Sequence, residues 1–244
     1  MSISGRQNDI LNLLKKDSFI TVKALSQATF TSESSIRRDL TKLQSQGLVR
    51  RTHGGVSLAD TVERVPSLNS RMIKNIVEKK KIAKKASTLL MDGQIIILDG
   101  SSTSSFLLPY IAAHRDITLF TNNMHTALKA IERGINTHCI GGKSVNGSAA
   151  LSGEEAYRTV SALYPDITFF SSQCVNINGT ISDSCAEENY LRSLMLQHTK
   201  KSVFLCDSDK FNTSAFYSLT TLKEVDYVVF DTAWEQLKMK CNLL

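Results

Sequence analysis

The sequence predicts an α/β protein in two parts, a small basic module followed by a larger domain with a mostly parallel sheet. Residues 31–55 combine apolar positions at helical spacing with exposed positive charge. Beyond residue 79, short apolar segments alternate with helical ones, as in α/β layered folds. Residues 1–85 hold 17 Lys/Arg and 7 Asp/Glu, a net charge of +10, whereas residues 86–244 hold 12 and 16, a net charge of −4. A basic segment joined to an acidic remainder is typical of a nucleic-acid-binding module attached to another domain.

Two short helices are expected before residue 31. The first lies within residues 6–16, and the second within residues 20–28, with Thr21 as its N-cap. Both place their apolar residues on one side. These residues are Ile10, Leu11, Leu13 and Leu14 in the first helix, and Val22, Leu25 and Ala28 in the second.

A third helix is expected after Ser32, whose hydroxyl can cap its first turn. Ile36, Leu40 and Leu43 form one narrow buried stripe, and Gly47 is expected to end the helix. The exposed face carries hydroxyls and cations, namely Ser34, Ser35, Arg37, Arg38 and Lys42. A small helix with such a face fits the major groove of B-DNA.

The segment VRRTHGG, residues 49–55, reads as a short basic strand and turn. Helix, helix, turn, helix and hairpin is the order of a winged helix-turn-helix. Residues 1–56 are therefore expected to bind double-stranded DNA. The candidate contacts are Thr21, Ser32, Ser34, Ser35, Arg37, Arg38, Lys42, Arg50, Arg51 and His53. A three-helix protein-interaction module is the alternative, and the Arg37-Arg38 pair and the basic hairpin favour DNA.

The pattern S-x-x-[ST]-I-R-R-D-L-x-x-L-x-x-x-G-x-[VL]-x-R-x-H-G-G, present as Ser32 to Gly55, resembles the DNA-binding domain of DeoR-type bacterial transcriptional regulators. Two turn positions depart from it. Phe30 stands where a small turn-forming residue is usual, and Thr31 stands where an apolar residue is usual. The resemblance continues through Pro66, Arg71 and residues 79–100.

Residues 57–78 lose apolar periodicity and are expected to form a linker, followed by a second domain over residues 79–244. In that domain IIIL, ITLF, THCI, ITFF, KSVFLC and DYVVF are the expected strands. Polar loops follow several of them, at the sheet edge where open α/β folds bind ligands. The loop at 99–104 is also a strand-to-helix junction, where hydroxyls and helix N–H groups can cradle a phosphate. The candidate effector residues are Asp99, Gly100, Ser101, Ser102, Thr103, Thr121, Asn122, Asn123, Gly141, Gly142, Lys143 and Lys210.

The resemblance extends to the family's C-terminal sensor, whose fold is shared with sugar-phosphate isomerases and which usually binds a phosphorylated sugar. It implies a similar fold and effector here. The family commonly has glycine where this chain has Ser101, and glycines around the positions of Ser171 and Cys174. A side chain at such a position can narrow or reshape the ligand pocket.

Other classes of function have little support in the sequence. The five histidines show no metal-ligand spacing, there is no G-x-S-x-G motif, and we expect no cofactor, metal or catalytic residue. No apolar run reaches the roughly 18 residues of a membrane span, and no signal-peptide core is present. Five scattered cysteines favour reduced thiols and a cytoplasmic protein.

We therefore expect a sequence-specific transcriptional regulator, a repressor of sugar or sugar-phosphate metabolism genes controlled by a phosphorylated sugar. Because operators mirror protein symmetry, we expect a homo-oligomer, either a dimer or a tetramer. Two alternatives remain open. One is a sugar-phosphate isomerase-like enzyme with a DNA-binding appendage. The other is a constitutive regulator whose second domain only oligomerises.

Overall fold

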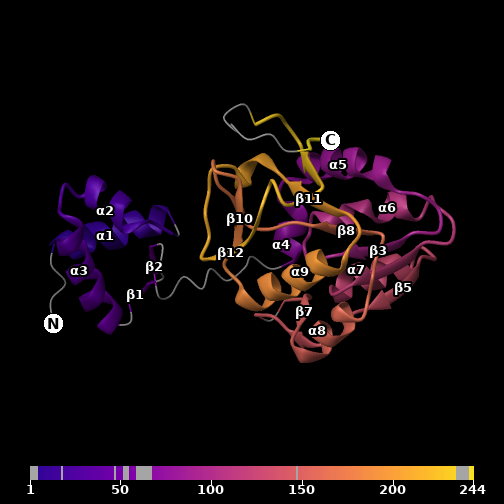
Figure 1. The fold of residues 1–244 in the computed structure, drawn as a ribbon, viewed down its shortest axis with the longest axis horizontal. Coiled ribbons are helices and arrows are strands. Elements are labelled where there is room, and N and C mark those ends of the chain that lie inside the picture. The colour runs from indigo at the N-terminus through magenta and orange to yellow at the C-terminus, as the bar shows by residue number, and fades with distance from the viewer. Residues whose placement is uncertain are drawn as a thin grey trace. The chain divides into compact units, whose positions relative to one another are not determined.

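The computed structural model describes residues 5–17, 19–46, 48–51, 55–58, 68–146, 148–234 and 242–244. The chain divides into two compact units (Figure 1). The first comprises Met1–Val65 with Ser214–Phe216, and the second comprises Pro66–Thr213 with Tyr217–Leu244.

The first unit is a three-helix module with a β-hairpin. Its elements are α1 (Gly5–Lys16), α2 (Val22–Ala28), α3 (Glu33–Ser45), β1 (Val49–Arg51) and β2 (Val56–Leu58). Their apolar faces form one core of Ile10, Leu14, Leu25, Ile36, Leu40, Leu43, Val49 and Val56. β1 and β2 pair antiparallel, and Ile20 bridges to Val56 beside them. The predicted winged helix-turn-helix order is thus confirmed.

Both predicted N-caps are present in this unit. The Thr21 hydroxyl accepts from the N–H of Ala24 at 3.1 Å, and the Ser32 hydroxyl accepts from the N–H of Ser35 at 3.4 Å. α3 ends at Ser45, before Gly47, which lies outside the described residues. In the turn between α2 and α3, Phe30 has a φ of +50° and a side chain that is 96% exposed. This left-handed conformation explains why small residues suit the turn.

The interval 57–78, expected to be a linker, contains several regular elements. Ser57 and Leu58 belong to β2, and residues 68–78 lie in α4 (Leu68–Ile73), in a short corner and in the first turn of α5 (Ile76–Ala86). Pro66 lies outside the described residues.

The second unit is built on a six-stranded parallel sheet in the order β13-β11-β8-β3-β4-β5. The strands are β3 (Ile95–Leu98), β4 (Thr118–Thr121), β5 (Asn136–Cys139), β8 (Ile167–Phe170), β11 (Ser202–Cys206) and β13 (Tyr227–Phe230). The chain runs outward from β3 to β5, then returns to the other side of β3 as β8. The point between β3 and β8 is therefore the topological switch point, where open α/β sheets bind ligands.

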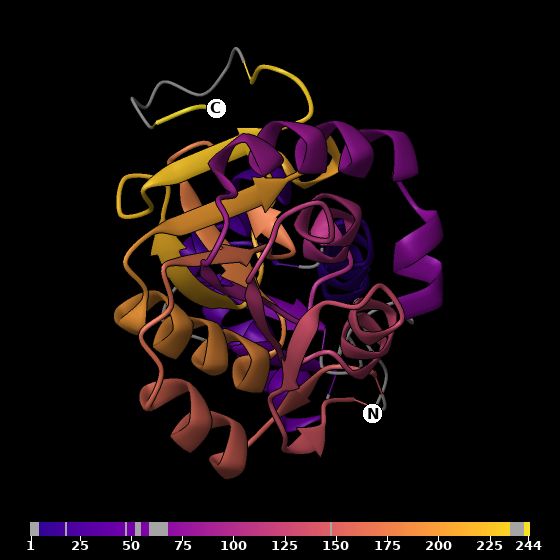
Figure 2. The same cartoon turned by 90° about the vertical axis from the view of Figure 1, so that its right-hand side faces the viewer.

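Helices cover both faces of this sheet (Figure 2). Ile96 and Leu98 of β3 pack with α5 and with the short α6 (Leu108–Ile111). Ile97, between them in sequence, packs on the opposite face with α8 (Glu154–Ser161) and α9 (Ala186–His198). This alternation is what a strand buried on both faces requires.

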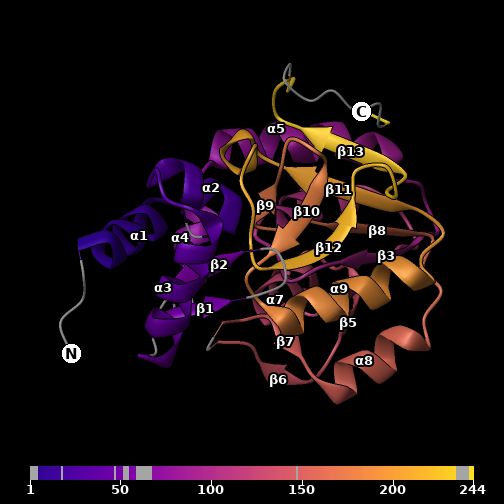
Figure 3. The same ribbon diagram turned by 60° about the vertical axis from the view of Figure 1, so that its left-hand side comes forward.

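Antiparallel pairing, which the sequence pattern did not predict, adds two small sheets to this unit. β9 (Cys174–Val175), β10 (Thr180–Asp183) and β12 (Tyr217–Thr221) form a three-stranded sheet in the order β12-β10-β9 (Figure 3). β6 (Lys143–Ser144) and β7 (Leu151–Ser152) form a hairpin. The remaining elements are α7 (Met124–Ile131) and the 3-10 turns η1 (Ser87–Leu89), η2 (Ser104–Leu107) and η3 (Ser208–Lys210).

Candidate nucleic-acid interface and anion site

The exposed face of α3 and the first hairpin strand line one concave surface of about 620 Å³. Its lining residues are Arg6, Ser35, Arg37, Arg38, Asp39, Thr41, Lys42 and Arg51. Five of these eight residues are cationic and one is acidic. Such a surface is suited to a polyanion.

The two adjacent arginines of α3 are exposed and only weakly held. Arg37 pairs with Glu33 one turn earlier at 3.5 Å, with its side chain still 58% exposed. Nε of Arg38 donates to the carbonyl of Ser34 at 3.4 Å. Exposed ion pairs of this kind contribute little to stability, so both guanidinium groups can reorient toward a ligand.

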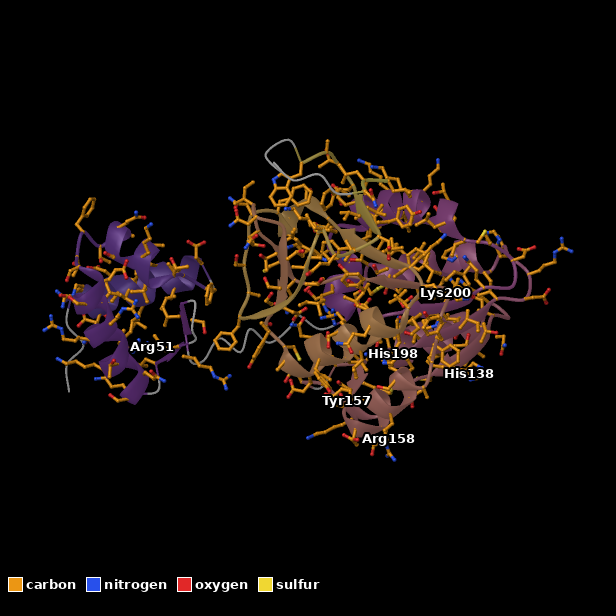
Figure 4. The ribbon with its side chains drawn as sticks, viewed as in Figure 1. Arg51, His138, Tyr157, Arg158, His198 and Lys200 are labelled. Carbon is orange, nitrogen blue, oxygen red and sulfur yellow. The ribbon has the colours of Figure 1, made fainter. Side chains whose placement is uncertain are left out.

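The hairpin is tied to α3 by a short chain of hydrogen bonds. Nη1 of Arg51 donates to the hydroxyl of Thr41 at 3.0 Å, and that hydroxyl donates to the carbonyl of Arg37 at 2.9 Å. Figure 4 labels Arg51 in this module. The link fixes the first hairpin strand and the exposed face of α3 in one surface.

The acidic residue of this surface is already neutralised. Asp39 is buried and accepts from Nε of Arg6 at 2.5 Å and from Nε2 of Gln7 at 3.4 Å. The hydrogen bond and the charge of Asp39 raise the pKa of Arg6. Arg6 was not among the predicted contacts, because its place on this surface depends on how α1 packs against α3.

The predicted DNA contacts fall into three groups. Ser34, Ser35, Arg37, Arg38, Lys42, Arg50 and Arg51 are exposed or half-buried. The hydroxyls of Thr21 and Ser32 act as helix caps. His53 lies outside the described residues.

At the switch point of the second unit, Asp99 is fully buried and holds the segment that follows β3. Its carboxylate accepts from the N–H of Ser101 at 3.2 Å, from the Ser101 hydroxyl at 2.5 Å and from the N–H of Ser171 at 3.2 Å. Asp99 therefore joins the loops after the two neighbouring strands β3 and β8.

Beneath these loops lies a buried charge cluster centred on Arg192 of α9. Its guanidinium binds Asp99 at 2.9 Å, Asp183 at 2.8 Å and Glu188 at 2.7 Å. Burial alone would lower the pKa of Arg192, but the three carboxylates raise it. Burial raises the pKa of Glu188, against the opposing charge of Arg192.

The loop after β3 carries buried residues with hydroxyl groups, of which some are hydrogen-bonded and some are not. The Ser101 hydroxyl points inward to Asp99 and Ser104, and the Ser105 hydroxyl donates to the carbonyl of Ser102. Within the part of the chain that the structure describes, the hydroxyls of Ser102 and Thr103 make no hydrogen bond. The serine at 101, where the family commonly has glycine, thus stabilises the loop from within.

The loop after β4 is tied to the same place. Asn123 caps α7 through the N–H groups of His125 and Thr126, and its Nδ2 donates to the carbonyl of Gly100 at 3.0 Å. The hydroxyl of Thr121 accepts from the N–H of Asn123 at 3.2 Å.

Asn122, next to this junction, has an unused acceptor. Its Nδ2 donates to the carbonyl of Leu151 at 2.8 Å, whereas its buried Oδ1 has no hydrogen-bond partner among the described residues. Gly100 is closely packed here, because a Cβ on it would lie 2.9 Å from the Cβ of Ala150 and 3.5 Å from Oδ1 of Asn122.

Gly141, Gly142 and Lys143 follow β5, the edge strand of the sheet. Gly142 has a φ of +130°, and a Cβ there would lie 2.6 Å from the carbonyl oxygen of Ser152. Lys143 is exposed in the hairpin strand β6 and pairs with Ser152. In the described chain no hydrogen bond or ion pair joins this segment to the loop after β3.

Lys210 follows β11 and reaches the loop after β8. Its Nζ donates to the hydroxyl of Ser171 at 2.8 Å and lies 3.4 Å from Asp207. The Ser171 hydroxyl in turn donates to the carbonyl of Leu205 at 2.6 Å. Ser171 therefore positions the ammonium of Lys210.

Lys79 of α5 is a buried cationic residue that was not among the predicted effector contacts. Its side chain is buried, and burial together with the nearby Lys210 lowers its pKa to about 8. The sequence contains a sign that Lys79 is buried. Lys79 lies three and four residues before the buried Ile82 and Ala83, and so shares their face of the helix.

A basic winged helix-turn-helix joined to an α/β domain with polar loops at its switch point defines a class of protein, the ligand-responsive transcriptional regulators. Residues 6–62 match the DeoR-like helix-turn-helix domain, and residues 74–232 match the DeoR C terminal sensor domain. The chain belongs to the DeoR family of transcriptional regulators.

Curated transcriptional regulators match this chain over nearly its whole length. The chain is 33% identical over 227 residues to the HTH-type transcriptional regulator GolR of Listeria innocua, covering 93% of this chain and 89% of that protein. It is 29% identical to the HTH-type transcriptional repressor GlcR of Bacillus subtilis (96% and 90% covered). It is also 29% identical to the lactose phosphotransferase system repressor of Staphylococcus aureus (95% and 93% covered). These relatives are named as regulators or repressors, not as enzymes.

One solved structure supports the fold of the chain, and a second shows a weaker likeness. eIF2B delta from Chaetomium thermophilum superposes with a TM-score of 0.50 at 15% identity, covering 94% of this chain and 72% of that chain. Ribose 5-phosphate isomerase A from Methanocaldococcus jannaschii superposes with a TM-score of 0.43 at 16% identity, covering 57% and 55%. At such identities a likeness concerns the fold alone.

Neither a membrane-spanning helix nor a metal site is present among the residues that the structure describes. None of the helices there is long and apolar enough to cross a membrane. In the same part of the chain, no group of three or more His, Cys, Asp and Glu residues could hold a metal ion.

Proposed function

We propose that this protein is a repressor of genes for sugar or sugar-phosphate metabolism, and that a phosphorylated sugar controls its affinity for operator DNA. The observation that carries the proposal is the concave cationic surface of α3 and β1. The same chain has polar loops at the switch point of its parallel sheet. The name of the lactose phosphotransferase system repressor supports the choice of sugar metabolism, and that of GlcR supports the choice of a repressor.

On the DNA side, Arg37 and Arg38 read base edges in the major groove. Arg is the side chain that most often makes bidentate contacts to guanine. Arg6, Lys42 and Arg51 surround them on the same concave surface and contact phosphates, which fixes the register of α3 on the duplex. The other predicted contacts, at Thr21, Ser32, Ser34, Ser35, Arg50 and His53, remain part of this proposal.

On the effector side, the hydroxyls of Ser102 and Thr103 and the ammonium of Lys210 bind the phosphate. Hydrogen bonds between a cationic donor and a phosphate are short and strong. The unused acceptor of Asn122 binds a sugar hydroxyl, which would satisfy an otherwise unpaired buried oxygen. Asp99 and Ser101 act indirectly by holding the loop in shape. Gly100, Thr121 and Asn123 join the loops, and Gly141, Gly142 and Lys143 border the site from the sheet edge.

The site binds the sugar phosphate without converting it. An isomerase needs a base that can accept a proton from a carbon atom of its substrate. Asp99, Asp183 and Glu188 are buried carboxylates that each bind Arg192. The buried Asp207 accepts from Nδ2 of Asn75 and lies 3.4 Å from Nζ of Lys210. Release of operator DNA requires only that the effector bind two states of the protein with different affinity.

We also propose that the protein acts as a homo-oligomer, either a dimer or a tetramer. One winged helix-turn-helix contacts a short half-site, and two copies related by symmetry double the contact area and match a palindromic operator.

Genome-wide mapping of bound DNA identifies the operator and, through neighbouring genes, the sugar phosphates to test. Calorimetry then measures the binding of those compounds to the wild type and to Lys210→Ala, with the exposed Lys223→Ala as the matched control. We expect the wild type and Lys223→Ala to bind one compound equally, and Lys210→Ala to bind it roughly tenfold more weakly or worse. No binding by the wild type across pentose and hexose phosphates would overturn the effector proposal in favour of a constitutive regulator.

A further inference from the structure

The ammonium of Lys79 closes the end of a neighbouring helix. It donates to the carbonyl of Arg71 and, at 2.7 Å, to the carbonyl of Lys74. These carbonyls lie at the C-terminus of α4, which ends at Ile73. A cation at this end satisfies unpaired carbonyls and interacts favourably with the helix dipole.

α4 and the corner after it contact both loops assigned to the phosphate. The Ser105 hydroxyl, in the loop after β3, donates to the sulfur of Met72 at 3.3 Å. Nδ2 of Asn75 donates to Asp207 at 2.9 Å and to Asp209 at 3.0 Å, in the loop after β11. Lys74 adds an ion pair with Asp209 at 3.0 Å.

Asn75 is held in an uncommon conformation at this corner. Its φ is +56°, and it precedes the first turn of α5 without capping that turn through its side chain. Its amide is used instead to bind the loop after β11. The corner is thus shaped by its contact with the anion site.

The charges around Lys79 are not balanced. Besides burial, Lys210 lowers the pKa of Lys79, Arg71 and Lys74 lower it further, and Asp207 alone among the named neighbours raises it. Among the residues whose charge acts on Lys79, cations therefore outnumber carboxylates, although Lys74 pairs with Asp209 at 3.0 Å and Lys210 lies 3.4 Å from Asp207. An anion placed among them would relieve this repulsion.

We propose that Lys79 is a second cationic residue of the effector site, and that it couples phosphate binding to the order of α4. This inference rests on the effector site proposed above. When phosphate binds beside Lys210, the charged form of Lys79 is favoured, and with it the bonds that close the last turn of α4. α4 is the first described element after β2 of the DNA-binding module. A change in the order of α4 on phosphate binding is therefore a way in which an occupied effector site affects that module.

The reciprocal effect follows from linkage. If phosphate strengthens the hydrogen bonds from Lys79 to the last turn of α4, a protein in which these bonds are formed binds phosphate more tightly by the same factor. Binding also raises the pKa of Lys79 above its value of about 8, so the complex takes up a proton near that pH. Affinity for the anion therefore falls as the pH rises from 7 to 9.

The test uses the full-length protein and sulfate, whose charge does not change between pH 7 and pH 9. Calorimetry in buffers of different ionisation enthalpy measures affinity and proton uptake, and amide hydrogen exchange follows residues 68–75. The variants are Lys79→Met, Lys79→Arg, and the exposed Lys81→Met on the same helix as the control.

We expect the wild type and Lys81→Met to bind sulfate with proton uptake near pH 8, and to gain protection in residues 68–75. Lys79→Met should bind roughly tenfold more weakly and show neither effect. Lys79→Arg keeps the positive charge at all these pH values, so it should bind sulfate without proton uptake. Sulfate binding by Lys79→Arg would also show that weak binding by Lys79→Met is not simply the result of a folding defect.

Two results would contradict the inference, and they differ in meaning. If the wild type binds sulfate and both Lys79 variants bind it with the same affinity and the same proton uptake, Lys79 has no role and the effector site stands. If the wild type binds neither sulfate nor any sugar phosphate, the effector site itself is wrong, and the role of Lys79 is rejected with it.

Discussion

The ammonium of Lys210 donates to the hydroxyl of Ser171, with 2.8 Å between Nζ and Oγ. The same hydroxyl donates to the carbonyl of Leu205 at 2.6 Å, so the serine links the lysine to the end of β11. The resemblance implied glycines around this position, where a side chain can narrow or reshape the ligand pocket. In this chain the side chain orients a cation instead.

Replacement of Ser171 by Ala should weaken binding of the sugar phosphate. One hydrogen bond that orients Lys210 is lost, which at about 1 kcal/mol corresponds to roughly a fivefold change in affinity. Calorimetry with the effector measures it. Ser172→Ala is the control, since the Ser172 hydroxyl donates to the carbonyl of Ser182 rather than contacting Lys210. Equal affinity in Ser171→Ala and the wild type would show that Lys210 needs no such support.

The double variant Arg37→Ala, Arg38→Ala should lose specific operator binding. At roughly 1–3 kcal/mol for each good base contact, the loss should be at least a few kcal/mol. A gel-shift titration measures the affinity. The exposed pair Arg115→Ala, Arg133→Ala removes the same charge from the second unit and should bind operator as the wild type does. Unchanged affinity in the Arg37, Arg38 variant would reject the assignment of α3 as the recognition helix.

Arg51→Gln should reduce the salt dependence of operator binding without changing sequence preference. Loss of one phosphate contact lowers the slope of log affinity against log salt by about 1. Titrations at several salt concentrations, on operator and on unrelated DNA, give both quantities. Arg158→Gln on α8, labelled in Figure 4, should leave the slope unchanged. A change in preference at one base pair would mean that Arg51 reads a base.

Glu188→Gln should change how stability depends on pH. Burial raises the pKa of Glu188 in the folded protein above its ordinary value of 4.5, so the folded state binds this proton more tightly than the unfolded state. The wild type therefore loses stability relative to Glu188→Gln as the pH rises above 4.5, until the raised pKa is passed. Urea unfolding between pH 4 and pH 8 measures the difference. A difference that stays constant or shrinks as the pH rises would contradict the raised pKa.

Local sequence signals predicted the DNA-binding module well. Thr21 and Ser32 were expected as N-caps because capping depends on residues two or three positions away, and both caps are present. Ile36, Leu40 and Leu43 were expected to form the buried stripe of α3, and all three are fully buried. Arg6 was missed because its partner Asp39 lies 33 residues away in the sequence.

In the second domain, more of the structure depends on contacts between residues that are far apart in the sequence, which local patterns do not predict. The alternation of apolar strands and helices predicted the parallel sheet, since that pattern is local. The antiparallel pairing of β10 with β12 and the cluster of Arg192 with Asp99 depend on residues far apart in the chain. Asp99 was expected to bind the effector, and its ion pair with an arginine 93 residues away gives it a role in holding the loop.

We propose above all that a sugar phosphate bound to the α/β domain changes the affinity of the winged helix for operator DNA. The most direct test is fluorescence anisotropy of a labelled operator fragment, titrated with protein in the presence and absence of the sugar phosphate found by calorimetry. We expect the effector to weaken operator binding by roughly tenfold or more in the wild type, within the usual range of allosteric coupling, and to have no effect on Lys210→Ala. Equal operator affinity with and without a saturating effector in the wild type would contradict the claim.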